Sequence, residues 1–377
     1  MKIALIHDHL TCKAGGEQVA LTFHKAFPEA PIYTLAFNPE ATFPEFKNCD
    51  VRTSWFNYIT YDESILKKLF FPLGILAMRS IYLDAFDVIL ISGTHCGKYV
   101  RFSPKTIVIT YCFTPFRLAW NPHSYSQYTF ANKFEKKVYD GLIKILKYFD
   151  KKYAKRTNFF IAMTNETKYR IECAYNPDKK IEIINPPVNN LNIFETPKDN
   201  KPKEYFLLVS RLEYYKKVDL AIEAFNKIDG KLIIVGQGSK ETELKELSDP
   251  SKITFLKNLT TKDLAQIYGN CRAFIFPQYE DYGLTALEAN ASGRPVIAFR
   301  KGGILDTQIE FNIDKKDGTA VFFDNQNVDS LIEAIFYFQK IESKFSPNLI
   351  RKNAERFSEK EFINSIKTFV KEKASTI

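Results

Sequence analysis

Two glutamates in the C-terminal half of the 377-residue chain have a spacing and a setting that point to chemistry. Glu280 follows a short apolar run, AFIFP, and Glu288 is the only charged residue in the apolar helical segment LTALEANA. A carboxylate among apolar residues needs a hydroxyl or a cation as its partner. Since ionised carboxylates accept hydrogen bonds, the pair predicts contact with sugar or ribose hydroxyls. The alternative interpretation is two unrelated surface residues.

Backbone amides beside the two glutamates suit a phosphate group. Gly283 lets the backbone approach a ligand closely, and the helical segment begins near Leu284. The first N–H groups of a helix have no intrahelical acceptor and lie at the positive end of its dipole. We therefore expect a phosphate to face the backbone N–H groups of Tyr282, Gly283, Leu284 and Thr285.

Two loops earlier in the same half add cations and glycines. Arg211 and Lys216 follow the apolar run YFLLVS, and two cations at one strand end suit a diphosphate. Gly236 ends the run KLIIVG and Gly238 follows it, which permits a tight turn and the close approach of a flat base. Basic residues after a strand and a plain strand-to-helix turn are the ordinary alternatives for these loops.

Short apolar runs that alternate with segments of helical spacing position these loops. That rhythm is typical of βαβ units around parallel sheets, in which ligands bind outside the carboxyl ends of the strands. The runs fall into two groups, which predicts two sheets. The first group comprises residues 2–8, 88–92, 106–110 and 159–164, and the second comprises 205–210, 231–236, 253–256, 273–277 and 295–299.

Length and composition favour two domains. A chain of 377 residues exceeds one ordinary core, and its 45% hydrophobic residues can fill two. Residues 185–204 are rich in proline, asparagine and charge and poor in apolar periodicity, which indicates an interdomain linker. We place the boundary after residue 190. From about Asn348 onward the pattern predicts two charged helices.

Net charge, cysteine content and hydropathy limit which partners and which cellular compartment are compatible with the sequence. The formal net charge of +9, from 53 Lys+Arg against 44 Asp+Glu, permits nucleic acid, a membrane or a phosphorylated substrate as partner. Six scattered cysteines without a CxxC pair favour a reducing, cytoplasmic location. The N-terminal run IALI is too short for a signal peptide, and no uncharged apolar stretch approaches the ~18 residues that span a bilayer. We expect a soluble or peripheral protein.

A basic segment, residues 131–157, predicts an amphipathic helix. Apolar residues recur there at helical spacing and lysines fill most other positions, which is typical of a solvated helix face. Peripheral contact with a membrane surface or with lipid phosphates is the alternative. The apolar residues are Phe134, Val138, Leu142, Leu146 and Phe149.

Both glutamates lie in a segment, FPQYEDYGLTALEANASGRPVIAFRKGGILDTQIE, that resembles the E-x7-E element of retaining glycosyltransferases of family 4, in the GT-B class. The segment VSRLEYYKKVDLAIEAF resembles the phosphate-binding Arg and Lys element of that family, and MKIALIHDHLTCKAGGEQVALTF resembles its N-terminal glycine loop. Three further segments, DVILISGTHCGKYV, YCFTPFRLAW and IEIINPPV, are similar to the mannosyltransferase-like branch typified by WbaZ. The resemblance runs along nearly the whole chain.

The resemblance implies a fold and a division of tasks. It implies an α/β protein of the GT-B type, with two Rossmann-like domains whose parallel sheets face a central cleft. Residues 1–190 would bind the acceptor, and residues 191–355 would bind the nucleotide-sugar donor. A helix over residues 356–377 would pack back on the N-terminal domain.

The resemblance also implies roles for individual residues. Glu288 would bind the ribose hydroxyls, and Glu280 would contact the hydroxyls of the donor sugar. Arg211 and Lys216 would neutralise the pyrophosphate leaving group. No Asp-x-Asp occurs in the sequence, and fixed cations with a helix N-terminus can replace a divalent metal, so we expect neither a metal nor a cofactor.

The N-terminal half departs from the family at one position. Gly15 and Gly16 would close over the phosphates from that side. Where the WbaZ-like branch usually has YC-His-TP, this chain has Phe113, which can neither accept a proton nor hydrogen-bond a hydroxyl. Three histidines near predicted strand ends are candidates for its place: His95, which we favour, His7 and His9. The candidate catalytic residues are then Glu280, Arg211, Lys216 and His95.

Together the residues and the resemblance predict a hexosyltransferase of polysaccharide biosynthesis that retains the anomeric configuration. GDP-mannose is the favoured donor, a UDP-sugar such as UDP-glucose is the alternative, and the acceptor is a glycan or a lipid-linked saccharide. Because of Phe113, a catalytically inactive sugar-nucleotide-binding relative is a second alternative. A nicotinamide-dependent dehydrogenase would need GxGxxG after the first strand, where the chain has only AGGE. No nucleic-acid motif supports a nucleic-acid partner.

Overall fold

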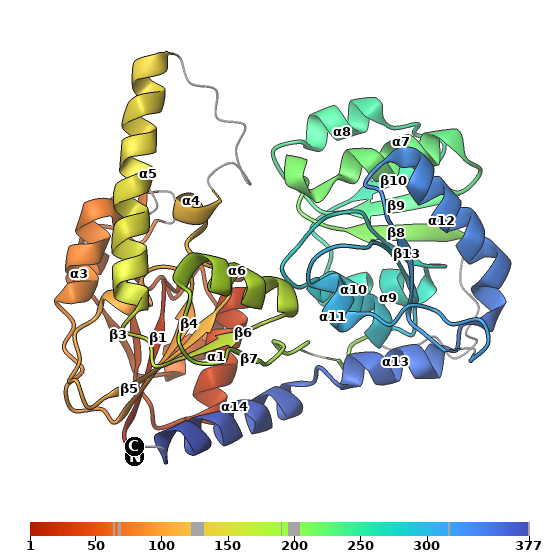
Figure 1. Ribbon diagram of the computed structural model, residues 1–377. Coiled ribbons are helices and arrows are strands. Elements are labelled where there is room, and N and C mark those ends of the chain that lie inside the picture. Colours follow the sequence, from red (N-terminus) through yellow and green to blue (C-terminus); the bar gives the residue numbers. More distant parts are fainter. Residues whose placement is uncertain are drawn as a thin grey trace. The chain divides into compact units, whose positions relative to one another are not determined.

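The computed structural model describes residues 1–62, 65–66, 69–121, 132–189, 191–194, 204–315 and 317–375. These residues form two compact units, one of residues 1–186 with 359–377 and one of residues 187–358 (Figure 1). The sequence placed the boundaries after residues 190 and 355, and the units divide after residues 186 and 358. Part of the linker, residues 195–203, lies outside the described residues.

A seven-stranded parallel sheet forms the centre of the N-terminal unit, in the order β3-β2-β1-β4-β5-β6-β7. β4 and β5 are buried along their whole length, as parallel strands covered on both faces are. The strand order reverses between β1 and β4, which is where ligands bind in open α/β sheets. The strands are β1 Ile3–His7, β2 Ile32–Thr34, β3 Val51–Thr53, β4 Val88–Gly93, β5 Ile107–Cys112, β6 Phe159–Ala162 and β7 Glu182–Ile183.

The helices of this unit begin at local signals in the sequence. The side chain of Asn132 accepts a hydrogen bond from the backbone N–H of Glu135 and caps α5, and Thr164 caps α6 in the same way. The C-terminal helix α14 packs on α1, where the rings of Phe362 and Phe23 stack with 5.6 Å between their centroids. The helices are α1 Gly15–Ala26, α3 Ile75–Arg79, α4 Arg117–Trp120, α5 Lys133–Ala154, α6 Asn165–Tyr175 and α14 Glu359–Ala374, with short turns η1 Pro44–Asn48, η2 Trp55–Tyr58, η3 Phe70–Gly74 and η4 Gly97–Tyr99.

A six-stranded parallel sheet forms the centre of the second unit, in the order β10-β9-β8-β11-β12-β13. Its strand order reverses between β8 and β11. The loops that follow these two strands therefore start side by side at the carboxyl edge of the sheet. The strands are β8 Tyr205–Val209, β9 Lys231–Val235, β10 Ile253–Leu256, β11 Phe274–Phe276, β12 Val296–Phe299 and β13 Ala320–Phe323.

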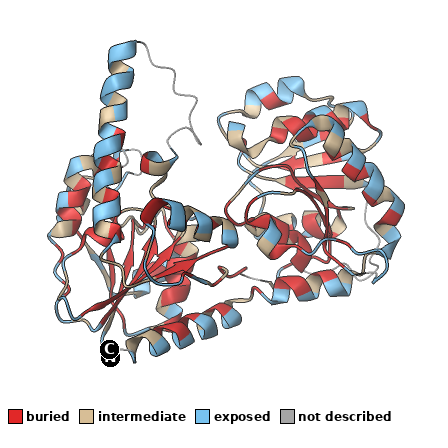
Figure 2. Cartoon of the chain, in the orientation of Figure 1, coloured by how far each residue is buried: buried red, intermediate tan, exposed pale blue. Residues whose placement is uncertain are grey.

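Helices of the second unit pack their apolar faces on this sheet. Phe206 of β8 lies 5.3 Å from Phe225 of α7 and 6.0 Å from Phe338 of α12, measured between ring centroids. Figure 2 shows buried strands in both units and exposed outer helix faces. The helices are α7 Val218–Lys227, α8 Glu241–Leu247, α9 Thr261–Asn270, α10 Leu284–Ala291, α11 Ile304–Thr307, α12 Val328–Ile341 and α13 Pro347–Glu355, with turns η5 Tyr214–Lys216 and η6 Glu342–Lys344.

The predicted α/β fold of two Rossmann-like domains, each built on a parallel sheet, is confirmed. Strands β1, β4, β5 and β6 and strands β8 to β12 correspond to the short apolar runs that the sequence marked. The sequence did not mark β2, β3 and β7, which are only two or three residues long, nor β13. Among the described helices, none has the length and the apolar character that crossing a membrane requires.

Candidate functional site

The loops after β8 and β11 bring a cation and a carboxylate into contact. Lys216 ends η5 in the first loop, and its ammonium group forms an ion pair with the carboxylate of Glu280 in the second. Both side chains remain partly exposed, at 13% and 21%. Arg211 lies in the same loop as Lys216, is exposed, and donates a hydrogen bond of 2.6 Å to the hydroxyl of Tyr215. The strand order thus gathers three of the four candidate catalytic residues at one edge.

Two glycines after β12 hold the Glu280 loop in place. Gly303 donates its backbone N–H to the carbonyl oxygen of Glu280 at 2.8 Å. Gly302 has φ +90°, and a Cβ there would lie 2.4 Å from the same carbonyl oxygen. A Cβ on Gly303 would lie 2.0 Å from the carbonyl oxygen of Asp281. Sequence reasoning missed both positions, although a Gly-Gly pair shortly after a strand is a signal of close backbone approach.

Helix α10 begins at Leu284, where the sequence placed its start. Gly283 precedes it with φ +102°, a left-handed conformation that suits glycine. The N–H of Ala286 donates to the carbonyl oxygen of Gly283 at 3.1 Å, so the N–H groups of Leu284 and Thr285 come before the first N–H that has an acceptor within the helix. The side chain of Tyr282 is buried, with its ring 6.5 Å from that of Phe357, so Tyr282 faces a ligand only through its backbone.

Glu288 has the hydroxyl partner that its apolar surroundings call for. The buried Tyr268 of α9 donates a hydrogen bond from its hydroxyl to Oε2 of Glu288 at 2.8 Å. Burial raises the pKa of Glu288 to about 7, although the hydrogen bond from Tyr268 opposes that rise. Because one carboxylate accepts several hydrogen bonds, Tyr268 leaves acceptor capacity on Glu288 for a ligand.

The raised pKa of Glu288 makes the stability of the fold depend on pH. The folded state holds the proton of Glu288 more tightly than the unfolded state does. Glu288 therefore lowers the free energy of unfolding least at low pH, and this destabilising effect grows between about pH 4.5 and 7. Glu288→Gln removes the charge and should raise the free energy of unfolding by ~2 kcal/mol more at pH 8 than at pH 5. Urea denaturation at both pH values measures this, with the exposed Glu246→Gln as control. An equal change at both pH values would contradict it.

Gly236 and Gly238 admit the backbone of the neighbouring loop. Gly236 has φ +151°, and a Cβ there would lie 1.9 Å from the carbonyl oxygen of Ser210. A Cβ on Gly238 would lie 2.3 Å from the carbonyl oxygen of Leu212. The N–H of Leu212 also donates to the carbonyl oxygen of Gln237 at 3.0 Å. The two glycines therefore fix the loop that carries Arg211, a reason that the sequence did not reveal.

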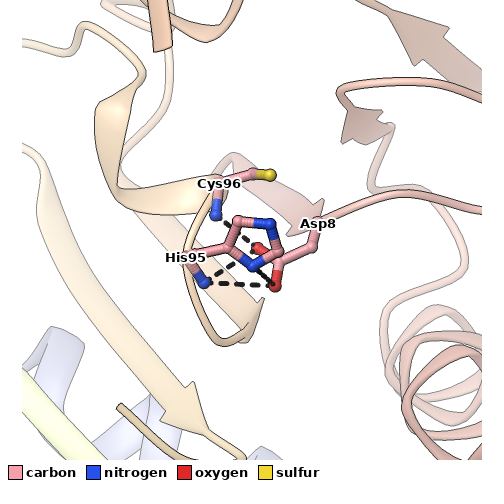
Figure 3. Close-up of side chains that lie close together, drawn as sticks. All are labelled: Asp8, His95 and Cys96. Carbon is pink, nitrogen blue, oxygen red and sulfur yellow. Dashed lines mark hydrogen bonds and ion pairs between the residues drawn. The ribbon is translucent and has the colours of Figure 1, made fainter. Parts of the chain in front are cut away.

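In the N-terminal unit, Asp8 positions His95 (Figure 3). The carboxylate of Asp8 accepts hydrogen bonds from the backbone N–H groups of Thr94 at 2.6 Å and Cys96 at 2.7 Å. Nδ1 of His95 lies 3.1 Å from Oδ2 of Asp8, and the His95 ring stacks on Phe116 with 4.8 Å between centroids. Burial opposes the charge of Asp8, but His95 holds its pKa well below the ordinary value. Asp8 is a site residue that sequence reasoning missed.

Ligand atoms of Asp8, His95 and Cys96 lie within 4.8 Å of one another, the spacing of a metal site. The donor set nevertheless does not fit a divalent ion. The oxygens of Asp8 already accept backbone N–H groups, including those of Thr94 and Gly97. Burial and the charge of Asp8 raise the pKa of Cys96 well above its ordinary value, whereas a thiol must lose its proton to bind a metal.

Helix α1 begins at the two glycines of the N-terminal loop. A Cβ on Gly16 would lie 3.3 Å from the ring of Phe113, so the phenylalanine borders this loop. The buried Glu17 follows directly, and its Oε1 lies 3.9 Å from Nε2 of His7. Burial opposes ionisation, but the neighbouring imidazole of His7 lowers the pKa of Glu17. Glu17, which sequence reasoning also missed, places an anion beside the loop that contains Gly15.

Comparison with protein families matches residues 189–371 to the family described as glycosyl transferases group 1. The glycogen synthase of Kosmotoga olearia is 36% identical over 207 residues, which are 48% of this chain and 42% of that protein. The alpha-1,3/1,6-mannosyltransferase ALG2 of Dictyostelium discoideum is 28% identical over 220 residues, half of each chain. The chain thus spans about half the length of the curated relatives that it matches.

Solved structures share the fold along the whole chain. Sucrose-phosphate synthase from Thermosynechococcus elongatus has a TM-score of 0.73 at 15% identity and covers 100% of both chains. Anabaena Alr3699/HepE in complex with UDP has a TM-score of 0.71 at 17% identity and covers 99% of this chain and all of that one. At these identities the likeness concerns the fold alone, which is the GT-B class that the sequence predicted.

Proposed function

We propose that the chain is a retaining glycosyltransferase that uses a nucleotide-sugar donor, because residues 189–371 match the family described as glycosyl transferases group 1. The observation that carries the proposal is the contact between Lys216 and Glu280, which joins the loop suited to a diphosphate to the loop suited to a sugar. In the reaction, the bond between the anomeric carbon and the β-phosphate oxygen breaks, and a bond from that carbon to an acceptor hydroxyl oxygen forms. The proton of the acceptor hydroxyl passes to His95 or to the leaving β-phosphate oxygen, and the nucleoside diphosphate leaves.

The residues of the second unit act on the leaving group and the sugar. Arg211, Lys216 and the first N–H groups of α10 stabilise the charge that develops on the diphosphate. When the diphosphate replaces Glu280 as the ion-pair partner of Lys216, the carboxylate of Glu280 can accept hydrogen bonds from the hydroxyls of the transferred sugar. Glu288, held by Tyr268, accepts the ribose hydroxyls.

Hexose transfer from GDP-mannose is the favoured reaction. A mannosyltransferase is among the relatives, and the mannosyltransferase-like branch typified by WbaZ was the resemblance that the sequence suggested. A UDP-sugar such as UDP-glucose is the second candidate, because a solved structure with this fold was determined with UDP. A glycan or a lipid-linked saccharide accepts the sugar, in the cytoplasm or at its membrane surface, without a nucleic-acid partner.

The N-terminal unit supplies the acceptor side in this proposal. Gly15 and Gly16 close over the phosphates, and His95, fixed by Asp8, is the polar side chain that we assign to the reacting groups. Phe113 contributes no proton transfer. If His95 does not take over that task, the chain binds the sugar-nucleotide without turning it over, which is the inactive alternative.

Turnover should not depend on a divalent metal. Release of nucleoside diphosphate from GDP-mannose, compared with UDP-glucose, is measured with and without EDTA. For each donor we expect the same rate with and without EDTA, because Arg211, Lys216 and the α10 N-terminus supply the charge that a metal would otherwise supply. If EDTA abolished the release and Mg²⁺ or Mn²⁺ restored it, the metal-independent mechanism would be wrong. If no donor released nucleoside diphosphate under any condition, the inactive alternative would be favoured.

A further inference from the structure

Helix α5, Lys133–Ala154, carries apolar side chains on two opposite faces, and only one face packs on the N-terminal unit. The residues of the buried face are Ile143, Leu146, Asp150 and Ala154. The second face carries an exposed apolar stripe whose members recur every three or four residues and are 43% to 76% exposed. The members of this stripe are Phe134, Val138, Leu142, Ile145 and Tyr148.

A buried polar cluster fixes which face of α5 points outward. Asp150 is fully buried and accepts hydrogen bonds from Nζ of Lys98 at 2.5 Å, the hydroxyl of Tyr175 at 2.7 Å and Nε1 of Trp120 at 2.7 Å. Turning the helix to bury the apolar stripe would leave this carboxylate without its partners, which is strongly unfavourable. The stripe is therefore held outward by the fold.

Lysines line one side of the exposed stripe. The helix contains seven lysines, all exposed except Lys147, whose ammonium group lies 5.3 Å from the ring centroid of Trp120. The acidic residues of the helix outside the buried cluster are Glu135 and Asp140. At 1.5 Å per residue, the helix presents this combination over about 33 Å. The sequence favours a solvated helix face for residues 131–157, and the structure adds that Phe134, Val138 and Leu142 are exposed on it.

We propose that the exposed face of α5 docks on the surface of an anionic lipid bilayer. A straight apolar stripe bordered on one side by flexible cations matches a flat surface, in which apolar side chains enter the acyl boundary and lysines reach the phosphates. The surface that binds this face should be negatively charged, because the helix has more lysines than acidic residues. This contact does not depend on the proposed transferase activity, so it is tested without any donor.

The test is co-sedimentation of the full chain with vesicles of phosphatidylcholine alone or of equal parts phosphatidylcholine and phosphatidylglycerol. We expect binding to the anionic vesicles that weakens as salt rises. Replacing Lys136, Lys137 and Lys144 by Gln should weaken it about a hundredfold, since each lysine near a charged surface contributes about fivefold. Replacing Phe134, Val138 and Leu142 by Ser should weaken it at least as much.

Matched controls test whether vesicle binding depends on this surface of α5 or on the charge and hydrophobicity of any exposed surface. Lys227, Lys231 and Lys262 are exposed on the second unit, and their replacement by Gln should leave vesicle binding unchanged. Phe336 and Tyr337 are exposed on α12, and their replacement by Ser serves as the apolar control. No binding to the anionic vesicles, or equal loss in variants and controls, overturns the proposal. Dissociation of a dimer by the stripe variant, with vesicle binding intact, would overturn it in favour of an interface between copies.

Discussion

Glu280→Gln is expected to lower turnover of the donor by ~10²–10³-fold, the scale on which one electrostatic group stabilises a transition state. The carboxylate faces hydroxyls of a sugar that becomes cationic as its bond to the leaving group breaks, so the contact strengthens in the transition state. Affinity for the bare nucleoside diphosphate should stay the same or rise, because Lys216 loses the carboxylate with which it pairs.

Calorimetry with nucleoside diphosphate and with donor, alongside steady-state rates, separates these effects. Glu246→Gln, at an exposed position on α8, is the matched control and should change neither quantity. If Glu280→Gln abolished binding of the bare nucleotide, the assignment of Glu280 to the sugar would be wrong. If it changed neither rate nor affinity, the whole loop would lie outside the site.

Arg211→Ala is expected to weaken nucleoside diphosphate binding by about 1.5–3 kcal/mol, or roughly ten- to a hundredfold. Arg211 is exposed and donates a hydrogen bond to the hydroxyl of Tyr215, so the change should leave the fold intact. Arg101→Ala is the matched control, since Arg101 is also exposed and also donates to a tyrosine hydroxyl, that of Tyr82. Calorimetry measures both variants, and an unchanged affinity in Arg211→Ala would remove Arg211 from the site.

Local patterns in the sequence predicted the fold because parallel strands buried on both faces read as unbroken apolar runs. They also predicted the start of α10, because Gly283 has a backbone conformation that favours glycine directly before an apolar helix. The loops that carry Arg211 and Glu280 could be identified without a structure for a similar reason. Both follow apolar runs, and the carboxyl ends of parallel strands meet at one edge.

Contacts between distant segments could not be read from such patterns. The pairing of Lys216 with Glu280 depends on β8 lying next to β11, a neighbour relation that periodicity does not encode. Tyr268 as the partner of Glu288 depends on how α9 packs on α10. The exposure of Phe134 depends on Asp150 fixing the rotation of α5, which helical spacing alone cannot distinguish from an inward orientation.

In the proposed function, the second unit holds a nucleotide-sugar through the loops after β8 and β11. Thermal unfolding of the full chain against a panel of nucleotide-sugars tests it most directly, because a ligand that binds only the folded state stabilises it by ~2.7 kcal/mol at a hundredfold excess over its dissociation constant. We expect GDP-mannose, or failing that UDP-glucose, to raise the melting temperature of the wild type and to raise that of Arg211→Ala less. A melting temperature that no nucleotide-sugar changes, or an equal rise in both proteins, would contradict it.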